Sequence, residues 1–347
     1  MTSRERVMTT FEFREPDKVP RWCGASPEFW EKAKRELGVD DEGLRVRFGD
    51  DFRRVFSTYV GPEPTLKREA TWESPFGVQR KGIGYGQPLD HPLAGVTSGE
   101  KIEAFPWPDP ARQDVSGVRS DAARYNGEYA VLGGEWSPFW HDVIDLVGQV
   151  NLYYMMYDTP DLVTLLFERV TDYYYEVSRR TFEAAGDEID IFFIGNDLGG
   201  QTGPLVGEDL FIRFLLPSFK RLIELGHSYG LKVMLHCCGG FRPLIPILIE
   251  AGLDGLHALQ PDTRGMEPAS LKRDFGGKIV LNGGIDSHHI LIDGPGPDFV
   301  REKTKELLDI MAPGGGYIGG ASHDTILEET PTENVLAMFD TIDAYRY

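Results

Sequence analysis

The sequence predicts an α/β protein built as one (β/α)8 barrel, a TIM barrel, with an N-terminal elaboration of helices and a hairpin. From about residue 130 onward, short apolar runs alternate with longer amphipathic segments, as in a parallel sheet whose faces are covered by helices. The length of 347 residues suits one such domain. No Gly-x-Gly-x-x-Gly motif follows the first strand to favour a doubly wound sheet. We expect residues 1–125 to form the elaboration and 126–347 the main barrel repeats.

The expected elements follow one another at regular intervals. Strands are predicted at 129–133, 189–195, 231–235, 255–259, 278–281 and 317–318. Helices are predicted at 142–156, 161–185, 208–229, 243–251, 266–275 and 297–311. The N-terminal part is less regular, with helices expected at 26–37 and 40–48, a hairpin at 72–86 and a rigid proline-rich connector at 106–110.

The amino-acid composition disfavours several classes of binding partner. The chain has 55 acidic and 36 basic side chains, a formal net charge of −19, which argues against nucleic acid and an anionic membrane surface as partners. An anionic substrate would need a local basic cluster acting against this field. No apolar run is long enough to span a membrane, and the first residues lack the apolar core of a signal peptide. Three cysteines, two of them adjacent, make no disulfide framework, so we expect a cytoplasmic protein.

Polar residues follow each predicted strand, where the catalytic face of a barrel lies. The segment 231–240, LKVMLHCCGG, is the most informative of these strand ends. Because strand side chains alternate, His236 and Cys238 point the same way, and Cys237 is expected to face the core. His323, in GGASHDT, offers a further nitrogen. Three protein ligands with a fourth position open are typical of a catalytic metal site. The alternative is a hydrogen-bonded histidine beside a small buried thiol.

Two further residues, Asp50 and His257, deserve an interpretation. Asp50, beside Asp51 in RFGDDFRRVF, is either a helix cap or a carboxylate that faces a cavity. His257 lies within a predicted strand, and we expect it to be a core histidine with its hydrogen bonds satisfied.

Motifs along nearly the whole chain resemble the uroporphyrinogen decarboxylase superfamily. They are REPDKVPRW, RFGDDF, PLAGVTSGEKIEAFPWPDP, NDLGGQTGPLVGEDLFIRFLLP, HCCGGFRPLIPILIEAGLDGLHALQP, LKRDFGGKIVLNGGID and GGASHDTILEETPTENVLAMF. The resemblance implies a (β/α)8 barrel with its site at the carboxyl ends of the strands.

Within that superfamily, the chain resembles the corrinoid- and zinc-dependent methyltransferase branch more than the decarboxylase proper. The decarboxylase has a motif of the form R-Q-A-G-R-Y, whereas RWCGASPEFW here has only Arg21. The H-x-C motif of the methyltransferases, which binds zinc, is matched by His236 and Cys238. Their third ligand is usually a cysteine before T-P-x-E-N. This chain has ASHDT there, so the resemblance implies His323 as the substitute and Asp324 as the next choice.

The implied function is a zinc-dependent methyltransferase that moves a methyl group between a small substrate, such as a methoxy compound or a thiol, and a corrinoid on a separate protein. Asp197 and Asp50 are the expected acid/base or orienting groups. Gln260, Asp286 and Asn196 are expected to hold the cofactor. Uroporphyrinogen decarboxylation and a non-catalytic barrel that binds a corrinoid or tetrapyrrole are the alternatives, and a homodimer is left open.

Overall fold

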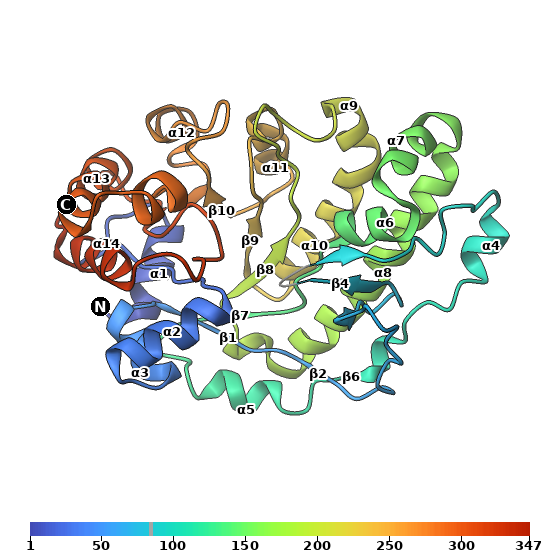
Figure 1. The fold of residues 1–347 in the computed structure, drawn as a ribbon, viewed down its shortest axis with the longest axis horizontal. Helices are drawn as coiled ribbons and strands as arrows, with labels where there is room; N and C mark the ends of the chain where they lie inside the picture. The colour runs from blue at the N-terminus through green and yellow to red at the C-terminus, as the bar shows by residue number, and fades with distance from the viewer. Residues whose placement is uncertain (83–85) are drawn as a thin grey trace.

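A curled sheet of seven parallel strands lies at the centre of the computed structural model, which describes residues 1–82 and 86–347 (Figure 1). In spatial order the strands are β1 (Phe52–Arg54), β7 (Ala130–Gly133), β8 (Ile191–Gly195), β9 (Lys232–His236), β10 (Gly255–Leu259), β11 (Val280–Gly283) and β12 (Tyr317–Ile318). Each strand lies beside the next one along the chain, as successive βα units require. The expected α/β architecture and its series of parallel strands are confirmed.

The ring of eight strands is not closed by strand pairing within the described residues. An irregular segment lies between β12 and β1. There the Trp22 amide donates to the Gly319 carbonyl (2.9 Å), and the Asp51 amide donates to the Arg21 carbonyl (3.0 Å). Arg21 and Gly319 form a single parallel bridge. Pro20 has no N–H to extend this pairing, so the sheet forms a half-barrel with an irregular eighth position.

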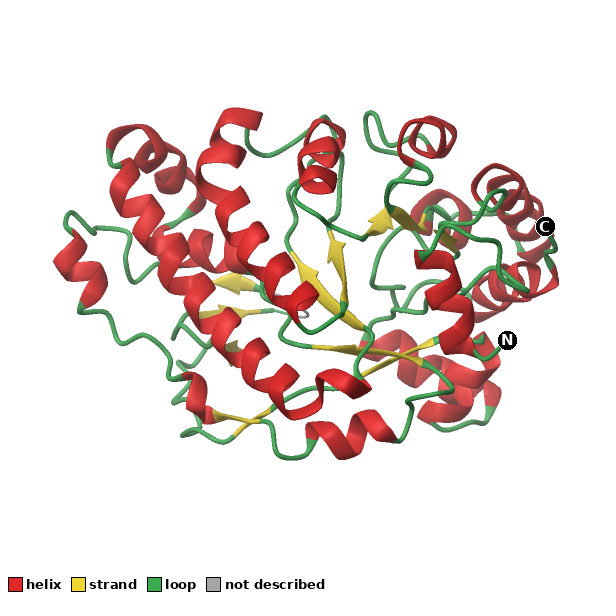
Figure 2. Ribbon diagram, turned by 180° about the vertical axis from the view of Figure 1, so that it is seen from behind, coloured by secondary structure: helices red, strands yellow, loops and turns green. Residues whose placement is uncertain are grey.

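Helices surround the sheet (Figure 2). Those of the main repeats are α6 (Phe139–Val147), α7 (Gln149–Asp158), α8 (Pro160–Ala185), α9 (Glu208–Leu210), α10 (Leu216–Ser228), α11 (Ile245–Glu250), α12 (Pro268–Phe275), α13 (Pro297–Met311) and α14 (Thr332–Ala344). None of the described helices combines the length and apolarity that crossing a membrane requires.

Two predicted helices differ from the structure for backbone reasons. The expected helix 142–156 is divided into α6 and α7 at Gly148, whose φ of 86° lies outside the helical region. The expected helix 208–229 contains a π-helical turn at Phe211–Leu215. Pro217 follows that turn, and its missing N–H interrupts the regular hydrogen-bond ladder.

The first helices of the N-terminal part pack beside β12 and α14, whereas its later helices contact α8 (Figure 1). It contains α1 (Ser3–Phe11), α2 (Pro27–Leu37), α3 (Asp41–Phe48), α4 (Gly99–Glu103) and α5 (Val118–Ala123). The predicted hairpin is formed by β3 (Trp72–Glu73) and β4 (Gln79–Lys81), and β5 (Gln87–Pro88) adds a third antiparallel strand. Residues 83–85 of that prediction lie outside the described residues. A further pair joins β2 (Thr58–Tyr59) to β6 (Gln113–Asp114).

Helix α1 closes the amino-end side of the sheet. Its Val7 and Phe11 pack with inward-facing side chains of several strands, and both are at most 4% exposed. The strand residues of this inner cluster are Phe52, Ala130, Leu132, Ile191, Phe193, Met234, Val280 and Ile318. With this end filled by apolar side chains, the polar residues that follow the strands lie at the opposite, carboxyl-end face.

We expect Phe11→Ala to destabilise the protein by about 3–5 kcal/mol, because it leaves a cavity in the inner cluster. Urea unfolding followed by circular dichroism measures the change. Tyr154→Ala, on a side chain that is 66% exposed, is the control and should change stability by no more than about 0.5 kcal/mol. Equal effects of the two variants would contradict the role of α1 as a plug.

Candidate functional site

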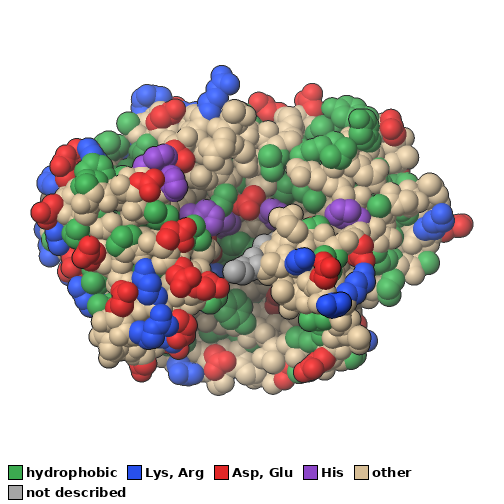
Figure 3. All heavy atoms as spheres, viewed as in Figure 1, with side chains coloured by type: hydrophobic (Ala, Val, Ile, Leu, Met, Phe, Trp, Pro, Cys, Tyr) green, Lys and Arg blue, Asp and Glu red, His purple; other side chains and the backbone are tan. Residues whose placement is uncertain are grey.

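Three side chains with metal-binding atoms converge at the ends of β8 and β9. The Nε2 atom of His236 lies 3.3 Å from the Sγ atom of Cys238 and 3.5 Å from an oxygen of Asp197. Each of the three offers an atom within 4.8 Å of the other two. Cys237 points away, fully buried, and its sulfur accepts a hydrogen bond from the Leu198 amide. Figure 3 shows histidine side chains around the central hollow of this face.

Interlocked glycines bring the two strand ends together. The Gly240 amide donates to the Gly200 carbonyl (2.8 Å). A Cβ atom on Gly239, whose φ is +79°, would lie only 2.4 Å from the carbonyl carbon of Gly199. This close backbone approach lets the Cys238 amide donate to the Asp197 carboxylate (2.8 Å). Only glycine tolerates both the positive φ and the short separation.

His257 forms a hydrogen bond with His236 through their ring nitrogens. Their Nδ1 atoms are 3.1 Å apart, so one of them carries the proton that the other accepts. If the Nε2 of His236 is to bind a cation, its Nδ1 must donate to His257. The Nε2 of His257 then carries a proton and faces an oxygen of Asp324 at 3.8 Å. His257 is therefore not the fully satisfied core histidine that was expected, since its Nε2 has no hydrogen bond among the described residues.

Burial and neighbouring charges set the protonation of the group. Burial lowers the pKa of His236 and lowers that of His257 further, so both imidazoles are neutral near pH 7. Burial, with Asp197 nearby, raises the pKa of the Cys238 thiol. Burial alone would raise the pKa of Asp197, but His141 and His236 bring it well below its usual range. Asp197 is thus a carboxylate, and the thiol needs a nearby cation to ionise.

His323 lies outside the group formed by Asp197, His236 and Cys238. Its ring centroid is 6.3 Å from that of His236, and its Nδ1 accepts a hydrogen bond from the Thr325 amide (3.0 Å). The local turn engages one of its two ring nitrogens. Among the described residues, Asp197 rather than His323 therefore has a metal-binding atom within 4.8 Å of those of His236 and Cys238.

A cavity of about 250 Å³ is lined by three of the residues singled out from the sequence, Gln260, Asp286 and His323, but by none of the three converging side chains. The Oε1 atom of Gln260 accepts a hydrogen bond from the Gly239 amide (2.9 Å), which ties the cavity wall to the loop that carries Cys238. The Asp286 side chain accepts hydrogen bonds from the backbone amides of His288 and His289, and so caps the helical turn that follows it.

Asn196 and Asp50 are enclosed by the backbone. Asn196 is fully buried, with its Oδ1 accepting from the Trp140 amide (2.9 Å) and its Nδ2 donating to the Ser137 carbonyl (3.1 Å). Asp50 is 3% exposed, pairs with Arg45 (2.8 Å) and accepts the Phe52 amide (3.3 Å). Asp50 follows Gly49, the C-cap of α3, and precedes β1, so the expected helix N-cap is wrong and Asp50 is instead a buried, ion-paired carboxyl.

Two further charged residues reach this face: Arg54, which the sequence analysis did not assign, and Asp324, its second choice for the third metal ligand. Arg54 ends β1, and Asp324 follows the segment that carries His323; their closest charged atoms are 3.6 Å apart. Burial alone would raise the pKa of Asp324, yet Arg54 and the histidines bring it below its usual range. The sequence could have indicated Arg54, because strand alternation places it on the same inner face as Phe52.

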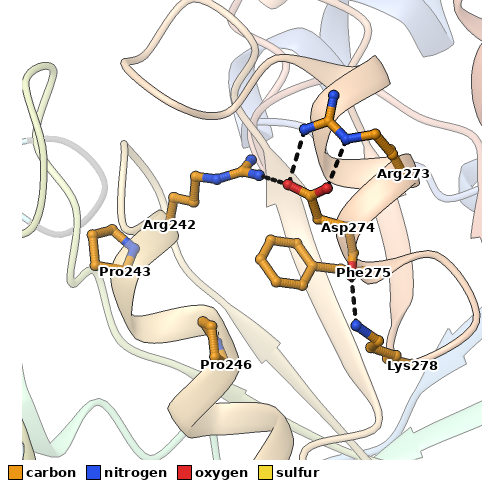
Figure 4. Close-up of a pocket in the computed structure, with 7 residues that line it drawn as sticks. All are labelled: Arg242, Pro243, Pro246, Arg273, Asp274, Phe275 and Lys278. Carbon is orange, nitrogen blue, oxygen red and sulfur yellow. Dashed lines mark hydrogen bonds and ion pairs between the residues drawn. The ribbon is translucent and has the colours of Figure 1, made fainter.

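A hollow of about 640 Å³ elsewhere, between α11 and α12, carries no comparable chemistry (Figure 4). Its charged groups satisfy one another, since Asp274 pairs with both Arg242 and Arg273. Lys278 donates to the Asp274 carbonyl (2.9 Å). These pairs brace the two helices.

The chain is similar to several known proteins. A family model described as uroporphyrinogen decarboxylase matches residues 96–345. The methylcobamide:CoM methyltransferase MtbA of Methanosarcina acetivorans is 21% identical over 245 residues, 67% of this chain and 63% of that protein. The match thus spans less than two thirds of that relative.

The uroporphyrinogen decarboxylase of Anaeromyxobacter dehalogenans is 25% identical over 308 residues, 86% of this chain and 82% of that protein. A solved methyltransferase from Methanosarcina mazei shares the fold, with a TM-score of 0.67 at 19% identity, covering 99% of this chain and 98% of that one.

Asp50 should titrate far from the range of an ordinary aspartate. Burial raises its pKa to about 6, outweighing Arg45 and Arg53, which lower it. A carboxyl that is easier to protonate in the folded state contributes stability below pH 4, and this contribution is lost as the pH rises through 6. We expect wild type to lose about 2–3 kcal/mol more than Asp50→Asn between pH 4 and 7 in urea unfolding. Parallel pH profiles for the two proteins would contradict this.

Proposed function

The chain belongs to the uroporphyrinogen decarboxylase family, and we propose that it is a metal-dependent methyltransferase within that family. It would move a methyl group between a small substrate and a corrinoid carried by a separate protein. The observation that carries this proposal is the convergence of the His236 nitrogen, the Cys238 sulfur and an Asp197 oxygen at the ends of neighbouring strands. The likeness to methylcobamide:CoM methyltransferases supports the choice of reaction.

The spacing of these atoms fits zinc. Bonds of about 2.0–2.3 Å in a tetrahedral arrangement place ligand atoms about 3.3–3.6 Å apart. The His236 nitrogen lies 3.3 Å from the sulfur and 3.5 Å from the carboxylate oxygen. The bond between His236 and His257 is also the kind of outer support that a ligating histidine usually has. Three ligands of mixed type would leave a fourth position for substrate.

The bound metal would supply Lewis acidity, which lowers the pKa of a thiol or polarises the oxygen of a methoxy group. The residues of the chain provide the setting for that chemistry. His257 fixes the orientation of His236, and the Cys238 amide fixes Asp197. Trp136 packs 5.3 Å from the His236 ring and covers one side of it. A rigid, partly buried group of ligands is what such chemistry requires.

The proposed transfer is balanced without an added oxidant or reductant. The methyl group leaves its heteroatom without the bonding electron pair, which the heteroatom keeps. Reduced cobalt of the partner's corrinoid supplies the electron pair of the new carbon–cobalt bond, and the heteroatom takes up a proton. The reverse direction would methylate a thiol.

Decarboxylation of a porphyrinogen finds less support in the structure. Arg21, the single arginine of the RWCGASPEFW segment, pairs with Asp343 (3.1 Å). A substrate with many carboxylates would need several cations, against a net charge of −19.

We expect His236→Ala, Cys238→Ala and Asp197→Ala each to lose most of the zinc bound by the purified protein, while His323→Ala retains it. The physical reason is that the first three side chains carry metal-binding atoms within 4.8 Å of one another, and His323 is not part of that group. Metal content is measured by mass spectrometry, with circular dichroism confirming the fold. The same three variants should lower transfer between methylcobalamin and a thiol, or between a methoxy compound and cob(I)alamin, by at least about 10²-fold.

The matched pair is Asp197→Ala and His323→Ala, since both side chains follow strands at the same face. Zinc lost from His323→Ala and retained by Asp197→Ala would reverse the assigned ligand set. Zinc bound by none of the five proteins, wild type included, would refute the metal site, and conversion of uroporphyrinogen would establish the alternative reaction.

A further inference from the structure

We infer that His141 is a positioning residue, which holds Asp197 in the orientation that a metal ligand requires. The role in metal binding rests on the proposed function, whereas the contact between the two residues does not. His141 lies in the first turn of α6, in a different βα unit from His236 and Cys238. Its link to the metal-binding group is thus made by tertiary contact and not by proximity in the sequence.

The imidazole of His141 contacts both the backbone and the side chain of Asp197. Its Nε2 atom accepts a hydrogen bond from the Asp197 amide (3.0 Å) and lies 3.4 Å from the Oδ2 atom of the carboxylate. The other carboxylate oxygen, Oδ1, accepts the Cys238 amide (2.8 Å) and lies 3.5 Å from the Nε2 atom of His236. One oxygen therefore faces the other two proposed ligands, while the imidazole of His141 stands beside the second.

Asp197 needs such a restraint because water can reach it. Its side chain is 37% exposed, whereas that of His236 is 7% exposed. A carboxylate that is free to turn toward solvent loses that freedom when it binds a cation, and the loss weakens binding. The Cys238 amide holds only Oδ1, so the carboxylate could still rotate around that contact. Because His141 binds the Asp197 backbone and lies beside Oδ2, it restricts this rotation.

The position of His141 is fixed in turn by Asn196, the residue before Asp197. The Oδ1 atom of Asn196 accepts the Trp140 amide (2.9 Å), and its Nδ2 atom donates to the Ser137 carbonyl (3.1 Å). Asn196 is fully buried, so water does not compete for these hydrogen bonds. Two successive residues after β8 therefore bind the same turn of α6: Asn196 holds that turn in place, and Asp197 receives the imidazole that the turn carries.

The first test uses metal-free protein, because it then does not depend on the proposed function. We expect His141→Ala to speed hydrogen exchange at the Asp197 amide by about 10-fold or more, since that amide loses its acceptor. His141→Gln should recover part of the protection, because an amide oxygen can accept the same hydrogen bond. Nitrogen chemical shifts of wild-type protein labelled in histidine should place the His141 proton on Nδ1, as a neutral ring that accepts at Nε2 requires.

Zinc affinity, measured by competition with a chelator, then tests the effect on metal binding. His141→Ala should bind zinc about 10- to 100-fold more weakly, with His141→Gln between it and wild type. His91→Ala is the matched control, since the His91 Nδ1 atom contacts the Asp145 carbonyl (2.7 Å) toward the other end of α6. It should bind zinc as wild type does, and circular dichroism checks the fold of each variant. With cobalt(II) in place of zinc, His141→Ala should keep the sulfur-to-metal absorption band of Cys238, while its ligand-field bands shift toward those of Asp197→Ala.

The outcomes separate this inference from the proposed function. Wild-type zinc affinity in His141→Ala would overturn the inference and leave the proposed function in place, whether or not exchange at the Asp197 amide changes. An equal loss of zinc in His91→Ala would also overturn it, because the effect would then follow from loosening α6. A wild-type protein that binds no zinc would refute the proposed function and with it the metal-binding role of His141, even if the exchange data show the contact with Asp197.

Discussion

The hydrogen bond from the Cys238 amide to the Asp197 carboxylate joins the ends of two neighbouring strands, and the site depends on it. It forms because Gly199 and Gly239 allow the two backbones to approach more closely than any side chain would permit. Without that approach, His236 and Cys238 would still share a strand face, but no third ligand atom would stand beside them. A backbone constraint, rather than any one reactive group, thus creates the arrangement.

Buried polar groups continue inward from this point in one connected series. His236 contacts His257, His257 faces Asp324, and Asp324 lies between Trp22 and Arg54. Neutral imidazoles in the middle keep the burial cost low, while the carboxylates at both ends stay ionised. The series therefore has the converging side chains of Asp197, His236 and Cys238 at one end and the ion pair of Arg54 and Asp324 at the other.

Much of this could be predicted from the sequence, because strand alternation is a local rule. It places His236 and Cys238 on one face, sends Cys237 into the core and would also have revealed Arg54 beside Phe52. The series of parallel strands follows from the same periodicity. The choice between Asp197 and His323 does not, since it depends on how two loops meet and on a turn that engages one nitrogen of His323. The division of one helix at Gly148 and the irregular eighth position beside Pro20 were likewise set by single backbone features that periodicity does not show.

X-ray absorption at the zinc edge tests the central claim most directly, because it counts the sulfur and the lighter ligands around the ion. For the purified protein the account predicts one sulfur at about 2.3 Å, with the remaining ligands nitrogen or oxygen at about 2.0–2.1 Å. In Asp197→Ala the signal of the lighter ligands should fall, or the ion should be lost. A shell with two sulfurs, or one that is identical in Asp197→Ala, would show that these side chains do not share a metal.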